Sequence, residues 1–290
     1  MTEHDTRKLV SDFYNEIGWK VEDDGFYQNA RYEDLRLVSR EYIHKCHLRV
    51  NRYISQAGKF LLDAGSGPVQ WPDYLTYSDG YQYRLCVDTS IVALKEARKR
   101  LGNKGLYAVS DVAALPFMTD AFDGLVSLHT LHHIPPEEQP AAYEGLVRVL
   151  KPGKSGVVVN AWSSPQLMKK MQPLVLFMDR VNGVVNRVVK KKESPPPNSN
   201  ETQKLKPTGT FTLHVTPEWL KERLNGKVDF QIRVWRSVSI RFLRSVIQPW
   251  LCGRLWLKLL FWLEDRNPVY YGENGQYPLI VIRKPSISNK

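Results

Sequence analysis

Cysteine is scarce in this sequence, and long apolar runs are absent. Only three of the 290 residues are cysteines, and no two of them form a Cys-x-x-Cys pair. A disulfide framework is therefore excluded, a structural zinc site is not expected, and a reducing compartment fits. The first residues, MTEHDTRKLVSDFY, lack the apolar segment of a secretory signal, and no uncharged run approaches the roughly 18 residues of a membrane span. We expect a cytoplasmic protein without a metal site.

The rest of the composition is that of a globular protein with an uneven charge. Hydrophobic residues make up 42% of the chain and charged residues 24%, which is ample material for a core. Residues 151–290 carry twenty-four Lys and Arg against nine Asp and Glu, so the overall net charge of +11 originates in the C-terminal half. A basic surface favours nucleic acid, anionic lipid or an anionic substrate, and it equally serves solubility.

Strand-like and helix-like segments alternate between residues 60 and 160. The N-cap candidate Ser90 and the apolar spacing after it predict a helix to Leu101. A second helix, from about 136 to 150, ends at Lys151-Pro152-Gly153. This alternation predicts an α/β fold with a parallel sheet covered by helices on both faces. The predicted strands are short apolar runs at 59–63, 83–88, 106–111, 124–128 and 154–161.

The residues that follow these strands are the candidate ligand site, because ligands of open α/β sheets bind beyond the carboxyl ends of the strands. The first strand runs into Asp63-Ala64-Gly65-Ser66-Gly67, whose glycines allow close approach to the backbone. Gln70 stands where a dinucleotide fingerprint has its third glycine, so the turn suits a nucleoside without a pyrophosphate. Asp88 and Asp111 follow the next two strands, where they could bind a ribose and an adenine or simply cap a helix.

Taken in order, these motifs resemble the class I S-adenosylmethionine-dependent methyltransferases. The resemblance is carried by LLDAGSG, VDTS, SDVAALPF, FDGLVSLHTLHHIP and RVLKPGKSGVVV, and it covers about a third of the chain. It is closest to the branch of ubiquinone- and menaquinone-biosynthesis methyltransferases and similar small-molecule enzymes. The resemblance implies a Rossmann-like, seven-stranded, mostly parallel sheet with last strands at 228–234 and 277–283, one of them antiparallel.

The resemblance also implies S-adenosylmethionine as the cofactor and gives it a set of residues. In the family, the first loop holds the methionine end, the acid after the second strand binds the ribose, and the pair after the third strand binds adenine. The backbone just after the fourth strand faces the methionine moiety. In that order the residues here are Asp63, Gly65, Ser66 and Gly67; Asp88 and Thr89; Asp111 and Val112; Leu128 and His129. The chain departs from the family at Val69, where a third glycine is frequent.

Two histidines, His132 and His133, lie beside the expected position of the methyl group. Methyl transfer requires nucleophile, methyl carbon and sulfur to be collinear, so positioning supplies much of the rate. A hydroxyl or ammonium acceptor must also lose a proton, and histidine is suited to accept one near neutral pH. We therefore take His132 or His133 as a candidate catalytic base. A cofactor contact or a structural role stays open, because this pair is common in the family whatever the substrate.

Four regions are expected along the chain. They are a helical N-terminal cap at 1–58, a cofactor-binding core at 59–162, an insert at 163–212 and the completion of the sheet at 213–290. Aromatic residues of the cap, such as Tyr14 and Trp19, could face a substrate or pack in the core. Within the insert, the Pro-, Asn- and Lys-rich composition of 186–209 predicts a mobile lid or tether.

Two stretches of the second half are unusually apolar. They are Leu174–Met178 in the insert and 242–263, FLRSVIQPWLCGRLWLKLLFWL, where tryptophans alternate with Arg and Lys. The charges and the proline argue against a membrane span. Core packing with a greasy acceptor pocket, peripheral contact with an anionic membrane and an oligomer interface all stay open.

The leading hypothesis is transfer of a methyl group from S-adenosylmethionine to a small, hydrophobic or lipid-like acceptor, with an oxygen or nitrogen nucleophile favoured. An RNA methyltransferase is one alternative, motivated by the basic C-terminal half. Nucleic acid is less favoured because no RNA-binding module and no Asp/Asn-Pro-Pro-Tyr/Phe motif is found. A non-catalytic, cofactor-binding partner subunit is the other alternative.

Overall fold

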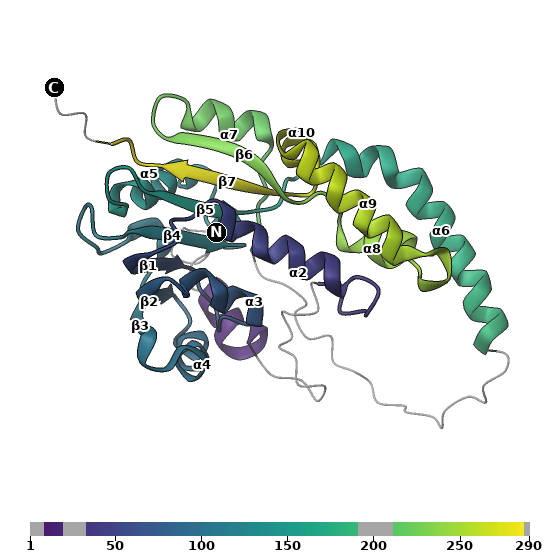
Figure 1. Ribbon diagram of the computed structural model, residues 1–290, viewed down its shortest axis with the longest axis horizontal. Coiled ribbons are helices and arrows are strands. Elements are labelled where there is room, and N and C mark those ends of the chain that lie inside the picture. Colours follow the sequence, from purple (N-terminus) through teal and green to yellow (C-terminus); the bar gives the residue numbers. More distant parts are fainter. Residues whose placement is uncertain (1–8, 20–32, 191–210, 287–290) are drawn as a thin grey trace.

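A computed structural model describes residues 9–19, 33–190 and 211–286 of the chain. Its centre is one seven-stranded sheet with the strand order β3-β2-β1-β4-β5-β7-β6 (Figure 1). The strands are β1 (Gly58–Ala64), β2 (Tyr81–Asp88), β3 (Gly105–Val109), β4 (Gly124–Leu128), β5 (Ser155–Val159), β6 (Asp229–Arg236) and β7 (Tyr277–Arg283). All seven predicted strands are confirmed, with ends that differ by at most a few residues.

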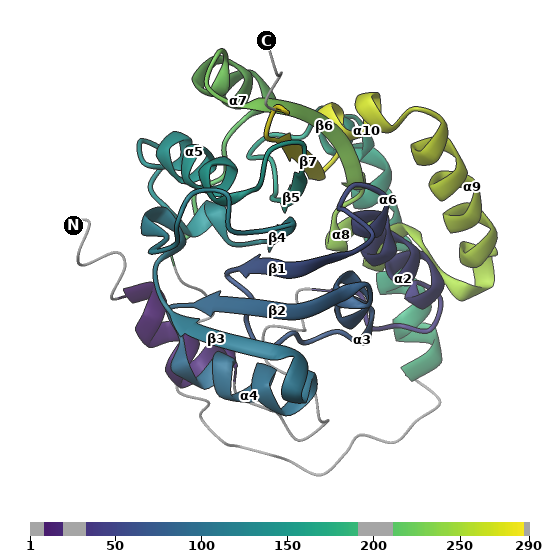
Figure 2. The same cartoon turned by 60° about the vertical axis from the view of Figure 1, so that its left-hand side comes forward.

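The first five strands pair in parallel, and β7 is antiparallel to both of its neighbours, β5 and β6. The predicted mostly parallel sheet is therefore confirmed. The chain moves outward from β1 to β2 and β3 and then returns to place β4 on the other side of β1 (Figure 2). The connections leaving β1 and β4 thus diverge to opposite faces, which opens a crevice beyond the carboxyl ends of these two strands.

Helices cover both faces of the sheet, as the apolar strands predict. Leu61 and Leu62 are adjacent on β1 and completely buried, yet they belong to two different core clusters, because successive strand residues point to opposite faces. On one face pack α5 (Gln139–Val149) and α7 (Pro217–Leu224), and on the other α3 (Pro72–Leu75) and α4 (Ile91–Leu101).

Side-chain caps explain where two of these helices begin. The Ser90 hydroxyl accepts a hydrogen bond from the Ala93 amide, 3.2 Å away, and Thr216 accepts one from the Trp219 amide at the same distance. Each bond satisfies an amide that has no partner within its own helix. The Ser90 backbone amide also donates to the Asp88 side chain, so the residue that begins this helix also positions a candidate site residue.

The insert and the Trp-rich stretch form a layer of helices beside the sheet. The elements are α6 (Gln166–Lys190), α8 (Ile240–Val246), the short turn Pro249–Leu251, α9 (Gly253–Arg266) and α10 (Pro268–Asn274). Of these elements, α6, α8 and α9 enclose a third apolar cluster together with α2 (Arg40–Leu48) from the N-terminal region, and the cluster includes Val175, Phe242 and Leu257. Of the predicted mobile segment 186–209, residues 186–190 belong to α6, and 191–209 lie outside the described residues.

The described part of the N-terminal region is largely helical, as predicted for the cap. Residues 9–13 form a helical turn that continues into a π-helical turn, Tyr14–Gly18, and α2 follows after residue 33. Among the helices that the structure describes, none combines the length and the apolar character needed to cross a membrane.

Candidate functional site

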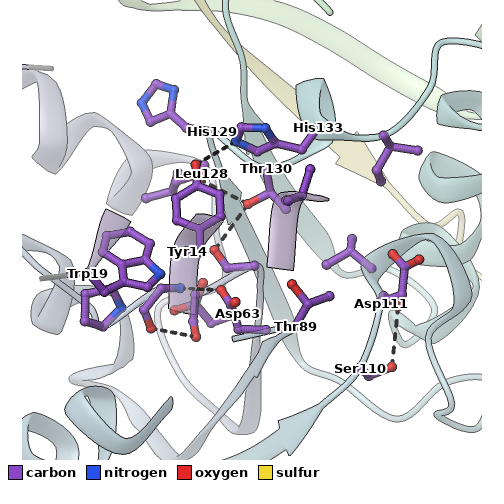
Figure 3. A pocket seen from close by; sticks show the side chains of 18 of the residues that line it. Tyr14, Trp19, Asp63, Thr89, Ser110, Asp111, Leu128, His129, Thr130 and His133 are labelled. Carbon is purple, nitrogen blue, oxygen red and sulfur yellow. Dashed lines mark hydrogen bonds between the residues drawn. The ribbon is translucent and has the colours of Figure 1, made fainter. Parts of the chain in front are cut away.

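A cavity lies beyond the carboxyl ends of β1, β2, β3 and β4, and we call it the strand-end cavity (Figure 3). All ten residues that the sequence assigned to the cofactor line it, together with aromatic residues of the N-terminal segment. The ten are Asp63, Gly65, Ser66, Gly67, Asp88, Thr89, Asp111, Val112, Leu128 and His129. The structure therefore brings together residues from four separate loops at one place.

The first loop of this cavity depends on glycine. Gly65 has a φ of 77°, in the left-handed region that side chains disfavour, and a Cβ there would lie 2.1 Å from the Thr130 hydroxyl oxygen. That hydroxyl in turn donates to the Gly65 carbonyl at 3.2 Å, which ties the β1 loop to the β4 loop. Val69 has a φ of 52°, so the valine at the family's glycine position adopts a strained conformation.

Asp88 is held in a fixed orientation by backbone amides. Gly67 donates to one of its oxygens at 2.9 Å and Ser90 donates to the other at 2.8 Å. Burial raises the pKa of Asp88 to about 6, against the opposing effect of these amide hydrogen bonds. The carboxylate is thus pre-positioned at the cavity wall, and a ligand hydroxyl there would favour its charged form.

Asp63 forms a buried ion pair with Arg84, a residue that the sequence gave no reason to select. Arg84 reaches the Asp63 Oδ2 atom with Nη2 at 2.6 Å and with Nε at 3.0 Å. Burial raises the pKa of Asp63, and the neighbouring guanidinium opposes that effect. Both side chains line the strand-end cavity, so this ion pair orients the carboxylate that the sequence assigned to the methionine end.

The N-terminal segment closes one side of the strand-end cavity. Ser90 donates to the Asn15 side-chain oxygen at 2.7 Å, which anchors the segment beside the Asp88 loop. Tyr14 and Trp19 stack on each other with ring centres 5.2 Å apart, and both line the cavity (Figure 3). Tyr14 belongs to the π-helical turn, a type of distortion that is frequent at functional sites. For these two aromatics the structure supports the first of the two open interpretations, a role at the site.

A second cavity adjoins the first, and we call it the histidine cavity because four histidines line it: His129, His132, His133 and His214. It shares Tyr14, Gln70, Tyr74, His129 and His133 with the strand-end cavity. Its remaining wall consists of Phe13, Glu33, Ala161, Thr212, Arg236, Gln276 and Tyr277. The two cavities therefore meet at a boundary of aromatic and polar side chains.

His133 and Tyr14 form a hydrogen-bonded pair at this boundary. The His133 Nδ1 atom lies 2.7 Å from the Phe211 carbonyl oxygen, which can only accept, so Nδ1 carries the proton. Burial lowers the pKa of His133 to about 4, so the ring is neutral and its Nε2 atom accepts from the Tyr14 hydroxyl at 2.9 Å. The proton-accepting Nε2 atom of the ring is thus directed toward Tyr14.

The other two histidines of the HTLHH segment occupy different positions. His132 lines the histidine cavity but not the strand-end cavity, and its Nδ1 atom has no partner among the described residues. His129 lines both cavities with a φ of 56°, and its ring packs edge-on against Trp235 with centres 4.9 Å apart. Burial lowers the pKa of His129 to about 3. Of the two candidate bases, His133 is the one at the boundary between the cavities.

The two apolar stretches line neither of these cavities. No residue of 163–190 or 240–275 belongs to the described wall of either one. Of the interpretations left open for 174–178 and 242–263, core packing is confirmed, whereas neither stretch contributes to the described walls of the two cavities. Their buried side chains fill the third apolar cluster, and their other side chains face outward.

Metal-binding residues do not cluster in the described part of the chain: no three His, Cys, Asp or Glu side chains there are placed to hold an ion. Among the described residues, the neutral histidines that line the histidine cavity are not arranged around one point where an ion could bind.

Comparisons with known proteins agree with this arrangement. Residues 62–158 match the family model of a methyltransferase domain, which spans β1 to β5 and the loops of the strand-end cavity. A comparison with curated proteins finds no match. The methyltransferase domain supports the expected enzyme class, a class I S-adenosylmethionine-dependent methyltransferase.

Solved structures share the fold at low sequence identity. Phosphoethanolamine N-methyltransferase 1 of Haemonchus contortus, in complex with phosphoethanolamine and S-adenosylhomocysteine, is 10% identical with a TM-score of 0.57. All of this chain is covered in that comparison, but only 51% of the Haemonchus protein. DhpI, in a complex with SAM and HEP, is 13% identical with a TM-score of 0.55, and 98% of this chain and 100% of DhpI are covered. These similarities confirm the Rossmann-like methyltransferase fold.

Proposed function

We propose that this chain transfers a methyl group from S-adenosylmethionine to a nitrogen or oxygen nucleophile of a small acceptor. The observation that carries the proposal is the pair of adjoining cavities, which share five residues at their boundary. The donor occupies the strand-end cavity and the acceptor the histidine cavity. Methyl transfer needs donor and acceptor in line across one boundary, and the adjoining cavities support this part of the proposal.

The residues of the strand-end cavity fit S-adenosylmethionine. The Gly65 turn leaves no room for a side chain and so exposes backbone, and Asp88 offers an oriented carboxylate to the two ribose hydroxyls. Asp111, which caps the turn Val112–Ala114 by accepting from the Ala113 amide at 2.8 Å, stands where adenine would lie. Asp63 and its partner Arg84 stand at the methionine end.

The chain's own contribution to the reaction is to orient the acceptor and to take its proton. S-adenosylmethionine, when bound, would supply an electrophilic methyl group; the acceptor's lone pair would form the new bond, and the electron pair of the broken C–S bond would stay on sulfur. The Tyr14 oxygen receives the acceptor's proton while its own proton passes to the His133 Nε2 atom, 2.9 Å away. Because the ring is neutral, it can take this proton without first losing one.

The finer identity of the acceptor is also part of this proposal. The motif order resembles the ubiquinone and menaquinone branch, which favours a small-molecule acceptor. The histidine cavity combines aromatic walls with Glu33 and Arg236, which favours an acceptor with a planar or apolar body and a polar head over a purely apolar one. The related Haemonchus structure, which holds phosphoethanolamine, is a precedent for a polar acceptor in this fold.

Peripheral contact with an anionic membrane is a further part of the proposal. Of the twenty large apolar side chains exposed in the described residues, five lie on α6 and eight between Trp250 and Tyr270. Residues 237–263 carry four basic and no acidic side chains, and α6 carries five basic side chains against Asp179 alone. Exposed tryptophan and leucine next to basic residues suit the surface of an anionic bilayer, which would bring a lipid-like acceptor to the enzyme.

The function is tested with methyl-tritiated S-adenosylmethionine and a cell extract separated into lipid, small-molecule, RNA and protein fractions. Label is expected in the small-molecule or lipid fraction, and Tyr14→Phe should lose it while still binding S-adenosylhomocysteine. Label in RNA would favour the nucleic-acid alternative. The absence of label from every fraction, with normal cofactor binding, would favour a non-catalytic partner subunit.

A further inference from the structure

The histidine cavity contains a buried cation whose hydrogen-bonding groups are unused. Arg236, at the end of β6, is 2% exposed and lines the cavity. Its Nε and Nη1 atoms have no hydrogen-bond partner among the described residues. A buried guanidinium is costly unless it is paired, so these N–H groups mark a position for a ligand.

The nearest carboxylate does not supply the missing partner. Glu33 Oε1 lies 3.7 Å from the Arg236 Nη1 atom, beyond hydrogen-bond distance, and 3.1 Å from the His47 Nε2 atom. His47 is in turn 2.9 Å from Asp73. Burial opposes protonation of His47, but Glu33 and Asp73 raise its pKa. Acidic and basic side chains alternate in this row from Asp73 to Arg236, and Glu33 Oε1 is already hydrogen-bonded to His47.

Aromatic rings fix the guanidinium in its place. Its central carbon lies 4.5 Å from the centre of the Tyr277 ring and 5.2 Å from that of Trp235. Stacking occupies the face of the guanidinium and leaves its N–H edges for hydrogen bonds. Arg236 is therefore pre-positioned, which lowers the entropy cost of binding an anion.

The same wall offers further unused polar atoms. His214 Nδ1 and Glu33 Oε2 are buried and have no partner among the described residues. Oε2 can accept from an N–H or O–H of a ligand, whereas Arg236 can only donate. The cavity thus provides a donor position for an anion and an acceptor position for a hydrogen-bond donor.

We propose that the acceptor carries an oxyanion, a carboxylate or a phosphate, and that Arg236 binds it and sets the acceptor's specificity. This inference rests on the proposed function. The same molecule presents its nucleophile to Tyr14 and His133, where the two cavities meet, and its oxyanion to Arg236 on the remaining wall. Arg236 is a binding residue in this account, and it takes no part in the proton transfer.

Two aromatic probes, phenyl phosphate and benzoate, test the subsite without any turnover. Binding to the protein saturated with S-adenosylhomocysteine is measured by calorimetry, with benzyl alcohol as the uncharged probe. We expect one of the two anions to bind the wild type and Arg236→Met to weaken that binding about 30-fold or more, with Arg236→Lys in between. The probe that binds distinguishes phosphate from carboxylate. Arg223→Met removes an exposed arginine outside both cavities and serves as the matched control.

The outcomes separate this inference from the proposed function. Failure of both anions to bind the wild type, or equal binding by wild type and Arg236→Met, would overturn the subsite. Arg236→Met should keep its affinity for S-adenosylhomocysteine, which shows that the variant is folded. If the probes bind through Arg236 but no labelled methyl group leaves S-adenosylmethionine in extract, the subsite stands and the methyl transfer fails.

Discussion

The hydroxyl of Tyr14 lies 2.9 Å from the His133 Nε2 atom, although 119 residues separate the two along the chain. The contact joins the N-terminal segment to the loop after β4, and it sits where the strand-end cavity meets the histidine cavity. Because Nδ1 of the same ring donates to the Phe211 carbonyl, the direction of the Tyr14 hydrogen bond is fixed. Proton transfer in our account runs along this one bond.

Removing either partner of this pair should lower turnover without affecting cofactor binding. Tyr14→Phe and His133→Gln are expected to reduce kcat by roughly 10²–10⁴, the usual contribution of a positioned acid or base. The double variant should be no slower than the worse single variant, because both act in one relay. His132→Gln tests the other candidate base, whose ring lines only the histidine cavity. Additive losses in single-turnover kinetics would contradict the relay.

Buried neutral histidines should make the protein sensitive to mild acid. Burial lowers the pKa of His133 to about 4 and that of His129 to about 3. An unfolded histidine titrates near its ordinary value of 6.5, so the unfolded state gains protons first as the pH falls below 6.5. Stability is therefore lost from pH 6.5 down to about 4, by up to about 1.4 kcal/mol per pH unit for each such histidine.

Urea unfolding at pH 7, 6, 5 and 4.5 measures this loss. Asp88 acts in the opposite sense between about pH 4 and 6, because its pKa is raised in the folded state, so the comparison must be between variants. His129→Asn, which tolerates a positive φ, should flatten the pH dependence relative to the wild type. Parallel curves for wild type and His129→Asn would count against a neutral buried His129.

The ion pair between Asp63 and Arg84 should be essential to the fold. Arg84→Met leaves a buried carboxylate unpaired, and we expect a loss of about 3–5 kcal/mol of unfolding free energy. Asp63→Asn combined with Arg84→Met should recover part of that loss, because no uncompensated charge remains. Denaturant titration of Asp63→Asn, Arg84→Met and the double variant measures the coupling free energy between the two side chains. A double variant as unstable as the sum of both single variants would show that the two side chains do not act as a pair.

The membrane surface is tested by flotation with vesicles. Trp256 and Trp262 are 60% and 56% exposed on α9, so Trp256→Asp and Trp262→Asp should weaken binding to anionic vesicles without unfolding the protein. Leu106→Asp, an exposed apolar position on β3, is the control. Binding should also fall with salt and with the fraction of anionic lipid. Equal flotation by wild type and both tryptophan variants would contradict the assignment of this surface.

Much of the fold could be predicted because its signals are local. Short apolar strands, the Ser90 and Thr216 caps and the acids after the strands each leave a pattern within a few residues. Arg84 could not be predicted, since a lone arginine in an apolar strand carries no sign of its partner on the neighbouring strand. The same holds for Glu33 and Arg236, which are brought together only by tertiary folding.

The apolar stretches show a second limit. The sequence of 242–263 left core packing, membrane contact and an oligomer interface open, because its pattern does not say which element covers which side chain. In the structure Leu257 packs with α2 and α8, while Leu255 and Trp256 face outward. An apolar segment near a site in the sequence is therefore weak support for a role in the pocket, and packing decides the matter.

Calorimetric titration of S-adenosylmethionine into wild type, Asp88→Ala and Asp79→Ala tests the central claim most directly. Asp88→Ala would strand two desolvated ribose hydroxyls, so we expect a loss of about 1–3 kcal/mol, or roughly 5- to 150-fold in Kd. Asp79 is exposed outside the cavity, and its variant should bind like the wild type. Wild-type affinity should also weaken as the pH falls below about 6, where Asp88 becomes protonated. A wild type that binds no S-adenosylmethionine, or an Asp88→Ala variant that binds it equally well, would contradict the account.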